Sequence, residues 1–366
     1  MTRSLSASQR RDWLRLARTE NVGAVTFDQL IQRFGEPALA LAALPDLARR
    51  GGRMARLKIP TERDANDELA AGEALGARLI AACEPEFPQA LAALDPPPPL
   101  IWVRGRIEIL DRPTVAIVGA RVASAAGQRF ARGLAAELGQ TGHIIVSGMA
   151  RGIDAAAHEG GMTTGTVAVL GGGIDDVYPP EHGGLYARIV ETGCVVSENE
   201  PGRTAVARDF PRRNRIIAGL SRAVVIVEAE LRSGSLITAR LAAEQGREVL
   251  AVPGSPLDPR ARGTNDLIRQ GAALCEGLDD VLRALEGLRG FRESEPLPFR
   301  AAPAEADAAL CNRLAELLSP TPVSRDELVR ASGAPAPSVF AALTELALAG
   351  RAELLPGGMV SKGSTP

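Results

Sequence analysis

Aromatic residues are scarce in this chain, at 3% of its 366 residues, and so are cysteine and histidine, with four and three residues. The cysteines are scattered and form no CxxC pair. We therefore expect four reduced thiols rather than disulfides or a zinc site. The histidines are too few and too separated to indicate a metal centre, so no metal and no cofactor are expected.

Long hydrophobic runs are also missing. No stretch approaches the roughly 18 apolar residues of a membrane span. The N-terminus, MTRSLSASQRRDW, lacks the apolar centre of a secretory signal peptide. The formal net charge is only -2, so any affinity for a polyanion has to be local. These features predict a cytoplasmic protein that makes no contact with membranes.

The pattern along the chain divides it into several parts. Residues 1–75 read as short helices, residues 76–288 as an α/β core, and residues 289–306 as a linker rich in Pro, Glu and Arg. Residues 307–361 contain three helical segments followed by a hairpin, which is the order of elements in a winged helix.

The core alternates short apolar runs with amphipathic helical segments. Continuous apolar runs indicate strands that are covered on both faces, so the fold class is α/β with a mostly parallel sheet. The expected strands are residues 78–81, 100–104, 115–118, 144–146, 167–170, 195–197, 224–227 and 249–252, with a short one near 272–275. In a parallel layout the turns after these strands open on one edge of the sheet.

Those turns are unusually rich in arginine and glycine. The first is VGARVAS, which lacks the GxGxxG spacing of a dinucleotide site. Its Arg121 suits a bidentate pair with a phosphate, and Ser124 suits a helix cap. The second turn offers Ser147, Gly148 and Arg151. The third turn, with Gly171 and Gly172, would let the backbone approach a ligand closely.

The densest basic segment is RTAVARDFPRRNR. Its candidate DNA contacts are Phe210, Arg212, Arg213, Asn214 and Arg215. Cationic side chains in the first turn of a helix oppose the helix dipole, which favours a binding role over a stabilising one. Phe210 supplies an aromatic ring for stacking on unpaired bases. We expect loss of oligonucleotide binding when Arg212 and Arg213 are both replaced by Glu.

Two later turns carry weaker signals of the same kind. The candidate phosphate ligands there are Ser233, Gly234, Ser235, Gly263, Thr264 and Asn265. Asp154 and His158 are four residues apart and could pair on a helix face, without an accompanying nucleophile. The would-be recognition helix of the winged helix, residues 336–349, holds no Lys or Arg. It is therefore poorly suited to a DNA groove.

The ordered series VAIVGARVAS, SGMARGIDAAAH, VLGGGIDDVYPPEH, SENEPG, FPRRNRIIAGLS, VVIVEAELRSGSLITA, VPGSP and GTNDLIRQGA resembles the DNA-processing protein A family, also called DprA or Smf. The resemblance covers roughly residues 78–288. It implies an extended Rossmann-like core, a sterile-alpha-motif-like or helix-hairpin-helix-like N-terminal domain, and a C-terminal winged helix.

The resemblance further implies binding of single-stranded DNA without catalysis, a homodimer formed through the core, and loading of RecA recombinase during natural transformation. By motif, DNA contacts carry over to Arg121, Ser147, Gly148 and residues 210–215. An alternative is a nucleotide-binding enzyme of the phosphoribohydrolase type, whose PGGxGT unit is absent here. Another alternative is an interaction scaffold with a merely structural core.

Overall fold

The computed structural model describes residues 3–288 and 307–363. The predicted linker, residues 289–306, lies outside the described residues. The chain begins with four helices, α1 (Ala7–Ala17), α2 (Ala24–Phe34), α3 (Pro37–Arg50) and α4 (Glu62–Ala74). Ser6 and Thr61 start α1 and α4 with capping boxes. Gly35, with φ of 75°, follows α2 and ends it.

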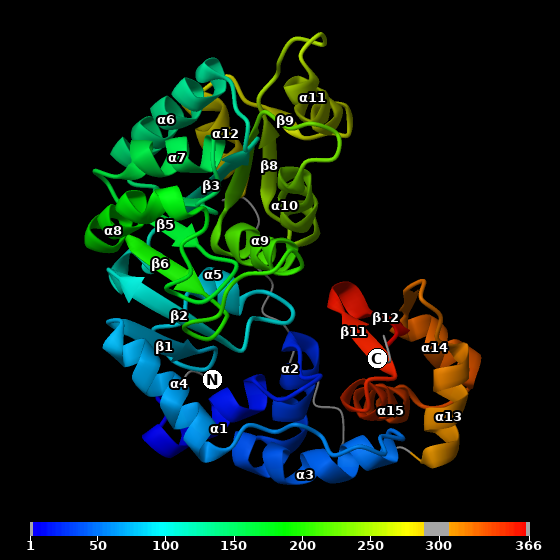
Figure 1. Cartoon of the computed structure of the whole chain (residues 1–366). Helices are drawn as coiled ribbons and strands as arrows, with labels where there is room; N and C mark the ends of the chain where they lie inside the picture. Colours follow the sequence, from blue (N-terminus) through cyan, green and yellow to red (C-terminus); the bar gives the residue numbers. More distant parts are fainter. Residues whose placement is uncertain (1–2, 289–306, 364–366) are drawn as a thin grey trace.

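A nine-stranded sheet forms the centre of the molecule (Figure 1). Its strands, in chain order, are β1 (Ala77–Ala81), β2 (Leu100–Gly105), β3 (Thr114–Gly119), β4 (Ile144–Ser147), β5 (Thr166–Val169), β6 (Cys194–Ser197), β7 (Ala223–Val227), β8 (Glu248–Ala251) and β9 (Ala273–Leu274). Their order across the sheet is β1-β2-β6-β5-β4-β3-β7-β8-β9. The pairs from β6 to β9 are parallel, while β1–β2 and β2–β6 are antiparallel. The predicted mostly parallel sheet is confirmed.

The strand order reverses at β3, because the chain moves outward through β4, β5 and β6 and then returns to add β7 on the other side. In open α/β sheets the crevice outside the carboxyl ends of the strands at such a reversal is the usual place for a ligand. The turns that the sequence singled out follow β3, β4, β5, β6, β7 and β8. The topology therefore brings them to one edge.

Helices cover both faces of this sheet. One apolar cluster joins the strands to α6 (Ala125–Gln140), α7 (Ile153–Gly161) and α12 (Leu278–Leu288). A second cluster, on the opposite face, joins them to α5 (Gln89–Ala92), α9 (Asp209–Leu220) and α10 (Gly234–Glu244). The remaining helices of the core are α8 (Gly183–Thr192), α11 (Arg262–Arg269) and the short η1 (Ile107–Asp111), η2 (Pro180–His182) and η3 (Pro259–Ala261).

The N-terminal helices share a core with the antiparallel end of the sheet. Trp102 of β2 is buried against α4, where its Nε1 donates to Glu68 Oε1 at 3.1 Å. A Cβ atom on Gly72 would lie 2.1 Å from the Trp102 ring, so only glycine allows this contact. From α1, Trp13 donates through Nε1 to the carbonyl oxygen of Pro99 at 2.7 Å. One apolar cluster accordingly runs from Leu5 to Val195.

The predicted winged helix is confirmed. It contains α13 (Ala308–Leu317), β10 (Val323–Ser324), α14 (Arg325–Ser332), α15 (Ala336–Leu348), β11 (Ala352–Leu355), η4 (Pro356–Gly358) and β12 (Met359–Lys362). The strands form an antiparallel sheet in the order β10-β12-β11 around a separate apolar core. In Figure 1 this domain stands beside α2 and α3, and α15 packs on both of these helices.

Among the helices of residues 3–288 and 307–363, none has the length and apolarity needed to cross a bilayer. The same residues contain no group of three His, Cys, Asp or Glu side chains arranged to hold a metal ion. All four cysteines are free thiols, and three of them are buried. Burial raises the pKa of Cys275 and Cys311 to about 12, so both stay protonated at neutral pH.

Candidate nucleic-acid interface

Three planar side chains from three separate segments meet at the carboxyl edge of the sheet. The guanidinium carbon of Arg121, in the turn after β3, lies 5.6 Å from the ring centroid of Phe210 in α9. The ring of Tyr178, from the segment after β5, lies 5.6 Å from Phe210 at an interplanar angle of 51°. Arg121 and Tyr178 are exposed and Phe210 is half-buried. These three residues are called the stacking platform below.

The platform is held in place by the segment that precedes α9. Arg203 donates through Nη2 to both carboxylate oxygens of buried Asp209, at 3.0 and 3.1 Å. Asp209 also accepts from the backbone N–H of Val206 at 2.9 Å, so its carboxylate lies at the start of α9. The ring of Phe210 then rests on Gly171, where a Cβ atom would lie 3.2 Å from Phe210 Cδ1.

Arg213, predicted as a phosphate ligand, lies beneath the platform instead. It is buried, and its Nη1 donates to the carbonyl oxygens of Gly148, at 2.6 Å, and Val169. Its pKa is lowered to about 10 by burial and by the positive charge of Arg121, against the opposing effect of the nearby Asp154 carboxylate. Arg213 therefore ties the ends of β4 and β5 to α9, and it is not presented to solvent.

Ser147 and Gly148 are buried in the same internal network. Ser147 Oγ donates to the carbonyl oxygen of Ile117 at 2.6 Å, and the Gly148 N–H donates to Asp154 Oδ2 at 3.0 Å. Burial raises the pKa of Asp154, while Arg213 and backbone N–H groups act in the opposite direction. The hydroxyl and amide expected to bind phosphate are thus engaged by the protein itself.

The hydrogen-bond donors at the start of α6 are likewise bound by other groups of the protein. Ser124 caps α6 as predicted, accepting from the Gly127 N–H at 2.9 Å. However, Glu228, at the end of β7, accepts from the Ser124 N–H at 2.9 Å and from its Oγ. The backbone of Glu228 is left-handed, with φ of 56°, which is rare for a residue other than glycine. Its carboxylate occupies the place at a helix N-terminus where a Rossmann fold holds a pyrophosphate.

The glycines after β5 serve close packing within the chain. A Cβ atom on Gly172 would lie 2.1 Å from Asp176 Oδ2 and 2.6 Å from the Arg203 carbonyl oxygen. The carbonyl oxygen of Gly171 accepts from Asn199 Nδ2 at 2.6 Å. Both glycines are buried. Their missing side chains make room for the 199–205 segment and for Phe210 rather than for a ligand.

The outer turns are also held by internal contacts. Ser233 caps α10 and its Oγ lies 2.7 Å from that of Ser235, which is buried. Gly234 accepts through its carbonyl oxygen from Asn214 Nδ2 at 3.3 Å. At α11, the Gly263 N–H donates to the Ala229 carbonyl oxygen at 2.7 Å and Thr264 is buried. Asn265 exchanges two hydrogen bonds with the backbone of Gly254.

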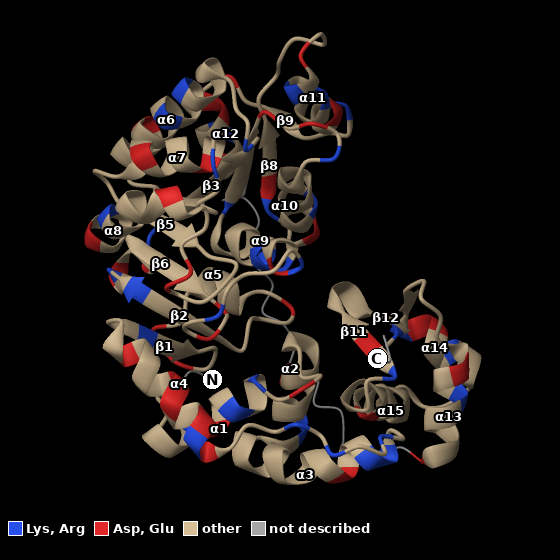
Figure 2. Cartoon of the chain, in the orientation of Figure 1, with Lys and Arg blue, Asp and Glu red and all other residues tan. Residues whose placement is uncertain are grey.

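Several arginines at this edge remain exposed. Four of these exposed arginines form no ion pair with any described residue: Arg121, Arg208, Arg212 and Arg232. Arg151 pairs with Glu181 on the surface, and Arg215 pairs with Glu198. Such surface pairs contribute little free energy and exchange readily for another anion. Figure 2 shows basic and acidic residues together around α9.

Sequence reasoning missed three residues of this interface. Tyr178 is not among the predicted contacts, and Arg208 stands in the basic run RTAVARDFPRRNR without being selected from it. Glu228 was not noticed, although an acidic residue directly after a buried strand was the available signal. Asp154 and His158 do not pair: Asp154 accepts backbone N–H groups, and His158 Nδ1 lies 2.8 Å from Thr166 Oγ1.

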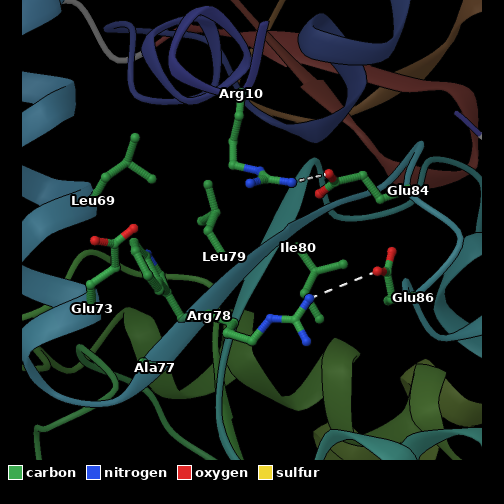
Figure 3. A pocket seen from close by; sticks show the side chains of 10 residues that line it. Arg10, Leu69, Glu73, Ala77, Arg78, Leu79, Ile80, Glu84 and Glu86 are labelled. Atoms are coloured by element: carbon green, nitrogen blue, oxygen red, sulfur yellow. Dashed lines mark hydrogen bonds and ion pairs between the residues drawn. The ribbon is translucent and has the colours of Figure 1, made fainter. Parts of the chain in front are cut away.

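A cavity of about 160 Å³ lies elsewhere, between α1, α4 and β1 (Figure 3). Four of its five charged side chains form ion pairs, Arg10 with Glu84 and Arg78 with Glu86 at 3.8 Å, and Glu73 leaves its lining acidic. It lies at the β1 end of the sheet, away from the stacking platform. We assign it no part in the interface.

Sequence models of known protein families match three parts of this chain. The sequence model described as DNA recombination-mediator protein A matches residues 78–286. The DprA-like N-terminal HHH domain matches residues 7–71, and the DprA winged helix domain matches residues 298–358. The chain belongs to the DprA/Smf family.

Two curated relatives illustrate the similarity. The chain is 40% identical over 291 residues to Protein Smf of Escherichia coli K12, covering 77% of this chain and 76% of Smf. It is 42% identical over 206 residues to DNA processing protein DprA of Streptococcus pneumoniae R6, covering 55% of this chain and 71% of that protein. A role in DNA processing and recombination follows for this DprA/Smf member.

Solved structures agree with the fold. The X-ray structure of DprA from Streptococcus pneumoniae superposes with a TM-score of 0.64 and 31% identity, covering 77% of this chain and 98% of that one. A structure of DprA from Helicobacter pylori, described as giving insights into its unique single-stranded DNA binding mode, has a TM-score of 0.53 and 29% identity, covering 59% and 97%.

Proposed function

We propose that this DprA/Smf member binds single-stranded DNA at the stacking platform and the arginines around it. The observation that supports this most is the meeting of Arg121, Phe210 and Tyr178 from three separate segments. Unpaired bases stack on aromatic rings and on guanidinium planes, whereas bases in a duplex have no free face. Such a surface favours a single strand over a double strand.

The exposed arginines supply the complementary interaction with the backbone. Arg208 and Arg212 lie at the start of α9, beside Phe210, and Arg232 lies in the segment after β7. A strand that stacks on the platform would place its phosphates within reach of these guanidinium groups, which bind phosphate oxygens in pairs. The remaining candidates at this edge, among them Ser147, Gly148 and Arg213, would act by shaping the surface.

The finer biological role follows from the family. The protein would protect incoming single-stranded DNA and load RecA recombinase during natural transformation, in the cytoplasm. The names of the curated relatives, DNA processing protein DprA and Protein Smf, and the single-stranded DNA binding described for the Helicobacter pylori structure support the DNA-binding part of this role. A homodimer formed through the core belongs to the same proposal.

We also propose that the chain acts without catalysis and without a cofactor. The carboxylate of Glu228 lies where a nucleotide phosphate would have to bind at α6. A phosphate there would meet charge repulsion instead of backbone donors. This internal carboxylate opposes a dinucleotide-dependent enzyme, and the absence of a PGGxGT unit opposes a phosphoribohydrolase.

The decisive test measures affinity for a labelled oligo-dT by mobility shift as salt is raised. Phe210→Ala should weaken binding by about 1–3 kcal/mol, the range of one base–aromatic stack. Arg121→Glu and Arg212→Glu should weaken binding and reduce the dependence on salt, because each removes a phosphate contact. Arg213 is avoided, since its loss would disturb the fold.

Arg222→Glu is the matched control. Arg222 is exposed and directly precedes β7, so it lies at the opposite, amino end of the strands. It undergoes the same change of charge and should leave affinity nearly unchanged. Equal weakening by Arg222→Glu and Arg212→Glu would mean that only net charge matters, and unchanged binding by Phe210→Ala would refute the platform.

A further inference from the structure

The helix of the winged-helix domain that would enter a DNA groove is enclosed between two domains. The buried residues of α15 are Val339, Ala342, Leu343, Thr344, Glu345, Leu346, Ala347 and Leu348. Val339, Leu343 and Leu346 belong to the core of the winged helix itself. Leu348 belongs instead to the apolar cluster of the N-terminal helices. The two sides of α15 thus serve two different cores.

Four polar contacts join α15 and the residues after it to the N-terminal helices. Thr344 Oγ1 donates to Gln29 Oε1 at 2.6 Å, and Asn21 Nδ2 donates to the Leu348 carbonyl oxygen at 3.3 Å. Arg351 Nη1 donates to the Gly51 carbonyl oxygen at 3.2 Å. Arg50 Nε lies 3.7 Å from Glu345 Oε1, and Glu345 is completely buried.

The closest approach occurs at Gly51, which ends α3. A Cβ atom on Gly51 would lie 1.9 Å from the carbonyl oxygen of Glu345 and 3.0 Å from the side chain of Ala349. Its φ of −67° and ψ of −4° suit any residue. Glycine is therefore required here by the neighbouring domain and not by the local backbone.

The composition of this contact is that of a separable interface. Each side has an apolar core within itself, and Leu348 of the winged-helix domain enters the core of the N-terminal helices. The contact contains an ion pair and several amide and hydroxyl groups, which water can satisfy when the two sides part. Glu345 is shared between the two sides, because its Oε1 faces Arg50 across the contact while its Oε2 accepts from Cys311 Sγ of its own domain at 3.7 Å.

We propose that the docked arrangement is a self-masked state, in which the winged-helix domain and the face formed by α2 and α3 hide each other reversibly. Opening presents the α2–α3 face to a protein partner. That partner carries what α15 carries, an apolar helical face with a carboxylate opposite Arg50. DNA is not the partner of α15, because residues 336–349 offer no Lys or Arg to neutralise phosphates.

The first experiment opens the contact in two independent ways in the full chain. Gly51→Leu inserts a side chain where Glu345 lies, and Arg50→Glu replaces the ion pair with repulsion. Small-angle X-ray scattering should show a larger radius of gyration for both, and hydrogen exchange in α2 and α3 should become faster. Unchanged scattering and exchange in both folded variants would overturn the proposal.

Matched controls separate opening from general damage. Arg49→Glu changes the neighbouring, more exposed arginine of the same helix end, whose ion-pair partner is Asp46. Gly133→Leu adds the same side chain to a helical glycine with no atom within 4 Å of its Cβ position. Both should scatter like the parent chain, and expansion of either control to the same extent would count against a specific contact.

The second experiment asks whether the hidden face binds a helix. The probe is a fluorescent peptide with the sequence of residues 336–350, added to the full chain carrying Leu348→Lys, which leaves α2 and α3 intact. Fluorescence anisotropy should show at least about tenfold tighter binding than to the parent chain, since the competing domain is removed. Leu317→Lys, on exposed Leu317 of α13, is the control. Equal weak binding to all three chains would show that the face is not a docking site.

Discussion

The buried imidazole of His158 shows how neighbours fix the protonation of a single residue. Thr166 Oγ1 donates to the Ile145 carbonyl oxygen at 2.8 Å, so the hydrogen bond between Thr166 and His158 takes its proton from Nδ1. Nε2 is buried and has no hydrogen-bond partner among the described residues. Burial, together with the positive charges of Arg213 and His182, lowers the pKa of His158 to about 3.

This depressed pKa predicts a dependence of stability on pH. The unfolded chain binds a proton near pH 6.5 while the folded chain does so only near pH 3, so this stabilisation is present above pH 6.5 and is lost as the pH falls toward 3. The loss amounts to roughly 4–5 kcal/mol over that interval. Urea unfolding of His158→Gln should show a shallower fall between pH 6.5 and 4 than the parent. Parallel pH profiles would contradict the assignment.

Arg212 and Arg213 show that the sequence alone does not predict which of two neighbouring arginines is exposed. Both were expected to bind phosphate, because both lie in a basic helix start beside Phe210. The structure leaves Arg212 exposed and buries Arg213 against the carbonyl oxygens of Gly148 and Val169, which lie 65 and 44 residues away in sequence. Neighbouring helical positions point in different directions, and only the tertiary partners decide which one faces inward.

At the scale of elements, the strands of the core were predictable because fully buried strands appear as uninterrupted apolar runs. The capped helices were predictable from Ser6 and Thr61, whose capping boxes are local. The turns were less predictable. Gly171 and Gly172 were assigned to ligand approach, whereas they admit the 199–205 segment and Phe210. A glycine that permits close packing looks the same in sequence whether the neighbour is a ligand or the protein.

Glu228 links two elements, because a residue at the end of β7 completes the start of α6. Glu228→Ala removes the carboxylate that accepts from Ser124 at the start of α6. This change should lower the free energy of unfolding by about 1–2 kcal/mol. Glu228→Gln keeps the shape and weakens only the charge, so it should cost less. Urea unfolding at neutral pH measures both. Equal stability of all three chains would show that the carboxylate does not stabilise α6.

At the scale of the whole molecule, the sheet ends in an uncovered edge at β9. Both of its residues are exposed, and Leu274 retains 42% of its surface. An exposed edge strand with an apolar side chain is a ready surface for a second copy. If the proposed dimer uses this edge, Leu274→Arg should yield a monomer in size-exclusion chromatography with light scattering. Leu39→Arg, a control at another exposed leucine, should remain dimeric.

The arrangement of the domains was the least predictable part. The winged helix was predictable from three helices and a hairpin, whereas the poor fit of its cation-free helix to DNA stays a prediction. Nothing local in residues 336–349 indicates that α2 and α3 would cover it, because Leu348 and Glu345 are ordinary helical residues in sequence. The contact between the two domains includes Gly51, whose carbonyl oxygen accepts from Arg351, 300 residues later in the chain.

The close packing of Trp102 of β2 against Gly72 of α4 limits where this protein can be truncated. A cut near residue 75 follows the change from helices to strands, yet it passes through the apolar cluster that both sides share. The shorter product, residues 1–75, would lose the strand residues against which its helices pack. The longer product would expose the Trp102 side chain and its neighbours to water. Residues before and after that point share one apolar cluster, so a truncation there is expected to lower solubility before it reports on function.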